Sequence, residues 1–188
     1  GAAHVLISVT EKGQTKTIGF SGDIGRANYP LHIDPQPFPE VDYLVCETTY
    51  GNRIHEDKDS PMDALGKVIK ETCIDRPGRL VIPAFSVGRT QAVLYTLNKL
   101  IEECNFPAVR VFTDSPMGRS STKIYSKYLS YLNPEAREFH RENDELFDVD
   151  NLIFLQTEKE SKAIRNYREP CIIISSSGIL FTFEMNSS

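Results

Sequence analysis

The sequence predicts an α/β protein: a doubly wound, mostly parallel sheet, with a few strands of another domain before it. From about residue 58 onward, short apolar runs alternate with segments of helical spacing. Strands that are buried on both faces and separated by helices are typical of βαβ units and parallel sheets. The residues before that point show only a hairpin pattern and one further strand, too few to bury a core. We therefore predict two parts, residues 1–57 and 58–188.

The first part begins with a predicted β-hairpin. Residues 4–9 and 15–20 read as its two strands, joined by a turn at residues 11–14. Residues 27–40 contain four prolines and predict an ordered loop. The apolar run at residues 43–46 then predicts a short strand that is buried on both faces.

Helix starts in the second part are marked by capping residues. Ser60-Pro61 combines an N-cap residue with a proline at the first helical position, and Asn133-Pro134 repeats this arrangement. Further helices are expected from Gly88-Arg89, from Asp114-Ser115 and over residues 158–167. Strands are expected at residues 80–84, 109–113, 152–156 and 171–175.

Composition excludes several classes of protein. The 188 residues are 40% hydrophobic and 25% charged, as in a folded globular chain. The net charge of −5 argues against a protein that coats DNA. Neither a membrane-spanning segment nor a signal peptide is visible, so we expect a cytoplasmic protein. Four cysteines without a CxxC motif indicate buried, reduced thiols rather than a cysteine-based zinc site.

Polar residues collect where the predicted strands end. In open α/β sheets, ligands bind at the carboxyl ends of the strands. Several strand ends here carry small hydroxyls, glycine and an acid, a pattern typical of sites that hold a phosphorylated ligand. These segments are residues 21–23, 47–51, 85–89, 113–116 and 175–178.

Each residue alone also has an ordinary structural explanation. Asp23 could cap a turn, and Glu47 could pair with an arginine. Ser86 and Ser115 could be N-caps, and residues 175–178 an ordinary loop. Arg89 lies in the first turn of a helix, where the helix dipole disfavours a cation unless an anion is bound. A solvated helix face would equally explain the four-residue spacing of Arg119, Lys123 and Lys127.

Taken together, the strand-end motifs resemble one family. The motifs are Gly1-Ala2-Ala3-His4-Val5-Leu6, Phe20-Ser21-Gly22-Asp23-Ile24-Gly25-Arg26, Cys46-Glu47-Thr48-Thr49-Tyr50-Gly51-Asn52-Arg53 with His55, Pro83-Ala84-Phe85-Ser86-Val87-Gly88-Arg89-Thr90-Gln91, Asp114-Ser115-Pro116-Met117 and Ile174-Ser175-Ser176-Ser177-Gly178. This series closely resembles the β-CASP family of metallo-β-lactamase-fold nucleases, which includes 3′-end-processing endonucleases and ribonuclease J.

The resemblance implies roles for these residues. His4 matches a zinc-binding histidine, Asp23 the carboxylate that bridges two zinc ions, and Glu47 the family's first acidic motif. The implied reaction is zinc-dependent hydrolysis of phosphodiester bonds in single-stranded RNA. The segments that would face the RNA contain Ser86, Arg89, Ser115, Ser175, Ser176, Ser177 and Gly178. Residues 1–57 would then be part of a metallo-β-lactamase domain, and residues 58–188 a C-terminally truncated β-CASP domain.

The sequence departs from the family pattern in its metal ligands. The defining HxHxDH motif is absent, and the histidines that follow the Ser-Gly motif in the family are absent too. Of the implied ligands only His4 and Asp23 remain. We therefore expect an internal fragment that is inactive on its own and holds an incomplete zinc site.

Two other functions stay open at this stage. A non-catalytic β-CASP paralogue could act as a scaffold subunit in RNA processing, although the presence of His4, Asp23 and Glu47 argues against it. A nucleotide-binding module is disfavoured because no GxGxxG or Walker A motif occurs. The oligomeric state is undetermined, with a homodimer as one option, and the sequence does not separate endonuclease from 5′-to-3′ exonuclease.

Overall fold

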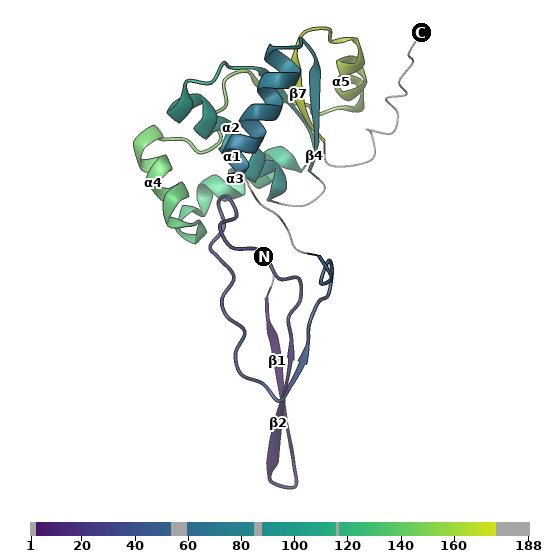
Figure 1. The fold of residues 1–188 in the computed structure, drawn as a ribbon, viewed down its shortest axis with the longest axis vertical. Coiled ribbons are helices and arrows are strands. Elements are labelled where there is room, and N and C mark those ends of the chain that lie inside the picture. The colour runs from purple at the N-terminus through teal and green to yellow at the C-terminus, as the bar shows by residue number, and fades with distance from the viewer. Residues whose placement is uncertain (1–2, 54–59, 85–87, 116, 176–188) are drawn as a thin grey trace. The chain divides into compact units, whose positions relative to one another are not determined.

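The computed structural model describes residues 3–53, 60–84, 88–115 and 117–175. The chain divides into two compact units, Gly1–Asp57 and Lys58–Ser188 (Figure 1). Ser86, Ser176, Ser177 and Gly178, four of the residues singled out in the sequence, lie outside the described residues.

The second unit is built on a parallel sheet with the strand order β4-β7-β5-β6. Each of its three strand pairs is parallel. The strands are β4 (Arg79–Pro83), β5 (Arg110–Asp114), β6 (Leu152–Phe154) and β7 (Cys171–Ser175). The predicted α/β class with a parallel sheet is thereby confirmed.

Helices connect the strands of this sheet. They are α1 (Pro61–Ile69), α2 (Arg89–Cys104), α3 (Gly118–Lys127), α4 (Pro134–Asn143) and α5 (Glu158–Ala163), with the short turns η1 (Lys70–Ile74), η2 (Leu129–Tyr131) and η3 (Ile164–Asn166). The predicted caps are present, because the Ser60 side chain accepts a hydrogen bond from the N–H of Asp63 and Asn133 from that of Ala136. These caps satisfy amide groups that have no partner within the helix.

The central strand β7 is buried along its whole length. Side chains alternate between the two faces of a strand. On one face, Cys171 and Ile173 join a core cluster with Ile164 of η3. Ile172 and Ile174 therefore point to the opposite face, where they are fully buried. Figure 1 shows α5 on one side of β4 and β7, and α1 and α2 on the other.

The first unit contains a three-stranded sheet. Strand β1 (Val5–Glu11) pairs antiparallel with β2 (Gln14–Phe20), which pairs in parallel with β3 (Tyr43–Val45). Asp42 fixes the position of β3, since its carboxylate accepts hydrogen bonds of 2.8 Å from Lys16 Nζ and from the N–H of Thr17. These two hydrogen bonds also lower the pKa of Asp42.

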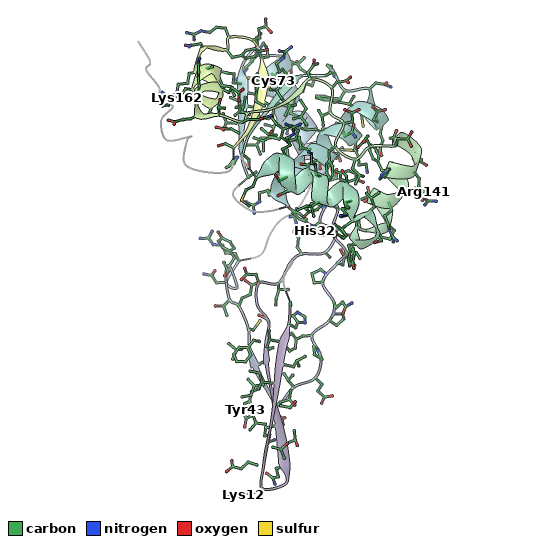
Figure 2. All side chains as sticks on the ribbon, turned by 180° about the vertical axis from the view of Figure 1, so that it is seen from behind. Lys12, His32, Tyr43, Cys73, Arg141 and Lys162 are labelled. Carbon is green, nitrogen blue, oxygen red and sulfur yellow. The ribbon has the colours of Figure 1, made fainter. Side chains whose placement is uncertain are left out.

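The prediction that β3 is buried on both faces is wrong. Tyr43, Leu44 and Val45 are 59%, 50% and 54% exposed, and Figure 2 shows the Tyr43 side chain projecting from the strand. β3 lies at the edge of its sheet, and the described residues of this unit supply no layer over it. Its apolar sequence therefore predicts the strand correctly but not its burial.

The cysteines are also only partly as expected. All four are free, and Cys73 and Cys171 are buried, whereas Cys46 and Cys104 are exposed. The exposed pair lies just beyond β3 and at the last residue of α2. Within the described residues, no helix has the length and apolar character needed to cross a membrane.

We predict that the burial of β7 dominates the stability of the second unit. Ile174→Ala should lower the free energy of unfolding by about 3 kcal/mol, because it leaves a cavity where the side chain is fully buried. The matched control is Ile153→Ala in β6, where the side chain is 38% exposed, and its cost should be less than half as large. Urea unfolding followed by circular dichroism measures both, and equal costs would contradict the role given to β7.

Candidate active site and strand-end cluster

Three segments of the first unit meet at one end of its sheet. Val5, the first residue of β1, pairs with Phe20, the last residue of β2. Phe20 in turn pairs with Val45, the last residue of β3. The residues just before β1 and just after β2 and β3 therefore share this end of the sheet, and they include His4, Asp23 and Glu47.

Hydrogen bonds hold the loops after β2 and β3 against each other. Glu47 Oε1 accepts a hydrogen bond of 2.5 Å from the N–H of Ile24, the residue after Asp23. The N–H of Glu47 donates to Ser21 Oγ at 3.0 Å, and the N–H of Ser21 donates to the Val45 carbonyl at 3.0 Å. Ser21 is almost fully buried. Ser21 belongs to the strand-end segment 21–23 noted in the sequence, but no role of its own was assigned to it there.

The backbone on both sides of this end is closely packed. Gly22 adopts a φ of +60°, and a Cβ atom there would lie 3.2 Å from the carbonyl oxygen of Ala3. Glycine therefore suits both the backbone conformation and the approach to residue 3. His4, the next residue, is half-buried, and its ring centroid lies 4.5 Å from that of Phe38. Asp23 itself is exposed.

The described residues do not fit a complete metal centre. Among them, no group of three or more histidine, cysteine, aspartate or glutamate side chains could hold a metal ion. His4 and Asp23 have the donor atoms that zinc accepts, an imidazole nitrogen and carboxylate oxygens. These two residues supply fewer protein ligands than even one zinc ion usually takes. The part of the chain that the structure describes therefore does not by itself form a site for two zinc ions.

The second unit brings three strand ends into one row. Ser175 at the end of β7 pairs with Pro83 on one side and Asp114 on the other, and its carbonyl accepts a hydrogen bond of 2.8 Å from the N–H of Ala84. Ser175 is buried, whereas Arg89 is exposed in the first turn of α2, the helix that follows β4.

The side chains after β5 have partners within the unit. Ser115 Oγ accepts a hydrogen bond of 3.1 Å from the N–H of Gly118, so this buried hydroxyl is the partner of the first amide of α3. Asp114 Oδ2 accepts one of 2.8 Å from the hydroxyl of Ser161. Arg119, Lys123 and Lys127 are all exposed on α3.

Gln91 links the starts of α2 and α3. It is the last residue of the motif that begins at Pro83, but this linking role was not predicted from the sequence. Its side chain is buried, and its Oε1 accepts a hydrogen bond of 3.1 Å from the N–H of Gly88. Its Nε2 donates to the Gly118 carbonyl at 3.3 Å and to Thr122 Oγ1 at 3.2 Å. One amide group thereby connects the segments that follow β4 and β5.

Comparison with protein families finds a match in the second unit. The family model described as the Beta-Casp domain matches residues 90–181. This range begins in the first turn of α2 and includes α3, α4, α5 and the strands β5, β6 and β7.

Three curated relatives match over most of this chain. Ribonuclease TTHA0252 of Thermus thermophilus is 26% identical over 92% of the chain, and the RNase J-like protein of Methanocaldococcus jannaschii is 29% identical over 96%. Transcription termination factor FttA of Methanosarcina mazei is 34% identical over 86%. The chain spans 39%, 40% and 26% of the lengths of these relatives, respectively.

We predict that Gln91 stabilises the second unit through its buried hydrogen bonds. Gln91→Ala should lower the free energy of unfolding by about 2 kcal/mol, because buried groups on both helices lose their partners. Gln156→Ala, at an exposed glutamine, is the control and should change stability by less than about 0.5 kcal/mol. Chemical denaturation measures both variants, and a neutral Gln91→Ala would show that its contacts contribute nothing.

Proposed function

The chain belongs to the β-CASP family of nucleases, and from this premise we propose that it is part of a zinc-dependent ribonuclease that hydrolyses phosphodiester bonds in single-stranded RNA. The observation that carries the proposal is the hydrogen bond between the Glu47 carboxylate and the N–H of Ile24. It places the acid at the end of β3 beside the loop that carries Asp23, at the same end of the sheet as His4.

In this proposal the first unit supplies reacting groups. His4 and Asp23 are two of the metal ligands, and further ligands would come from outside the described residues. When bound, zinc would supply a Lewis acid and a hydroxide nucleophile. Glu47 is oriented by its hydrogen bond to Ile24. It would pass the proton released by the attacking water to the leaving oxygen of the phosphodiester, or would orient a neighbouring histidine.

The second unit would hold the RNA backbone. Arg89 is exposed at the first residue of α2, the helix that follows β4. We propose that Arg89, Ser86 and residues 176–178 contact phosphate groups. Ser115 and Ser175 are buried, so they would hold the ends of β5 and β7 in place rather than touch the RNA. Contacts to phosphate position a nucleic acid without reading its sequence.

We predict that the 188-residue chain alone binds zinc substoichiometrically and does not cleave RNA. The described residues offer no cluster of three metal-ligating side chains, and two donors do not hold a zinc pair. Elemental analysis after dialysis, together with a cleavage assay on labelled single-stranded RNA, provides the measurement. Two zinc ions per chain accompanied by cleavage would contradict this prediction.

We predict that the full-length protein cleaves single-stranded RNA and loses this activity when a chelator is added.

In the full-length protein, Glu47→Gln should lower kcat about 100-fold, because the side chain keeps its size but no longer transfers a proton. Glu40→Gln, at an exposed acid of the same unit, is the control and should leave kcat unchanged. RNA binding without any cleavage would overturn the proposal and favour a scaffold subunit.

A further inference from the structure

Helix α3 and the short segments on either side of it contain basic residues but no acidic ones. The chain carries a net charge of −5, yet residues 115–134 include three basic side chains and three tyrosines but neither aspartate nor glutamate. The basic residues are Arg119, Lys123 and Lys127. The segment covers α3, η2 and the turn before α4, so its positive charge is concentrated in one part of the second unit.

Helix α3 is attached by one face and presents its cations on another. Thr122 accepts a hydrogen bond from Gln91, and the Tyr125 ring lies edge-on to Phe147, with 6.3 Å between the ring centroids. Arg119, Lys123 and Lys127 follow each other at four-residue intervals, so they lie along one side of the helix, and all three are exposed. Within the described part of the chain, none of them takes part in an ion pair.

Two exposed aromatic rings continue this row of cations. Tyr128 is 49% exposed and Tyr131 is 74% exposed, at the end of α3 and in η2. Their ring centroids lie 6.2 Å apart, and Lys127 Nζ lies 5.6 Å from the centroid of Tyr128. We call these five side chains the α3 platform: Arg119, Lys123, Lys127, Tyr128 and Tyr131.

A cavity lies next to the end of the platform. It has a volume of about 520 Å³ and is shared between η2 and α4. Its lining combines apolar surface with basic groups, from Leu129, Pro134, Arg137, Glu138, His140 and Arg141. Glu138, the acid among them, is paired with Arg141, which projects from α4 at the edge of the unit in Figure 2.

We propose that the α3 platform binds single-stranded nucleic acid, with phosphates along Arg119, Lys123 and Lys127 and unpaired bases stacked on Tyr131 and Tyr128. The adjacent cavity receives a further base. This inference rests on the proposed function, and it assigns the substrate a path on the second unit that includes none of the strand-end residues discussed above.

The combination of cations and exposed rings identifies the occupant. Single-stranded nucleic acids bind to grooves in which basic side chains follow the backbone and aromatic rings stack with the bases. A duplex would use the cations alone, because its bases are already stacked and paired. An acidic peptide would likewise bind to the cations, but the exposed rings of Tyr128 and Tyr131 would add no affinity for it.

The test is fluorescence anisotropy of the 188-residue chain with a labelled 12-nucleotide single-stranded RNA. Tyr131→Ala should weaken binding about fivefold through the loss of one stacked base, whereas Tyr131→Phe, which keeps the ring, should bind like the unchanged chain. Lys123→Gln should reduce the slope of log K against log salt concentration by about 0.7, the value for one phosphate contact on a single strand. An abasic oligomer of the same length should bind equally to Tyr131→Ala and to the unchanged chain.

Two controls match the exposure of the substituted residues. Tyr43→Ala removes a tyrosine that is 59% exposed in the first unit, and Lys159→Gln removes an exposed cation of α5. Neither should change RNA binding. The inference is overturned if Tyr131→Ala binds RNA as tightly as the unchanged chain does. It is also overturned if this substitution weakens the binding of the abasic oligomer or of a polyglutamate peptide as much as the binding of RNA.

The outcomes for the platform and for the enzyme are distinguishable. Cleavage by the full-length protein, combined with unchanged RNA binding by Tyr131→Ala, would retain the proposed nuclease and reject the α3 platform. Weakened binding by Tyr131→Ala in a full-length protein that cleaves no RNA would support the platform and reject the nuclease.

Discussion

The in-register pairing of β7 with β4 and β5 is the constraint on which the second unit depends. Its five residues are buried on both faces, so a shift by one position would exchange the side chains that pack on the two faces. The same register brings Pro83, Ser175 and Asp114 side by side. Burial of the strand and alignment of the loops that follow the strands are therefore set by one set of hydrogen bonds.

The first unit aligns its loops through register as well, but without a comparable core. Asp42 fixes β3 beside β2, and this brings Glu47 to the backbone of Ile24. The strands are nevertheless widely exposed, with Val5 at 52%, Val9 at 52% and Val45 at 54%. Apolar strands this widely exposed are normally covered by another layer of structure. Because the described residues of this unit provide no such layer, the geometry around Glu47 depends on local hydrogen bonds rather than on packing.

The sequence predicted features that neighbouring residues determine. The helix starts at Ser60 and Asn133 follow from a cap and a proline within a few residues, and both caps form. The exposure of β3 was missed, because an apolar run has the same sequence whether or not another layer covers it. The linking role of Gln91 was also missed, since its partners Gly118 and Thr122 lie more than twenty residues away along the chain.

The distribution of charge explains how an acidic chain can suit a polyanionic ligand. Some exposed cations of the second unit are compensated locally, as in Lys70 with Asp75 and Lys162 with Glu158. The two opposite charges of such a pair have little net effect on a charged ligand more than about 10 Å away at moderate salt. The acid-free segment 115–134 has no such compensation within itself. The positive potential of this segment is therefore not cancelled by acids within it, although the chain as a whole is negatively charged and would repel a phosphate backbone. The local distribution of charge, rather than the net charge, determines where a polyanion can bind.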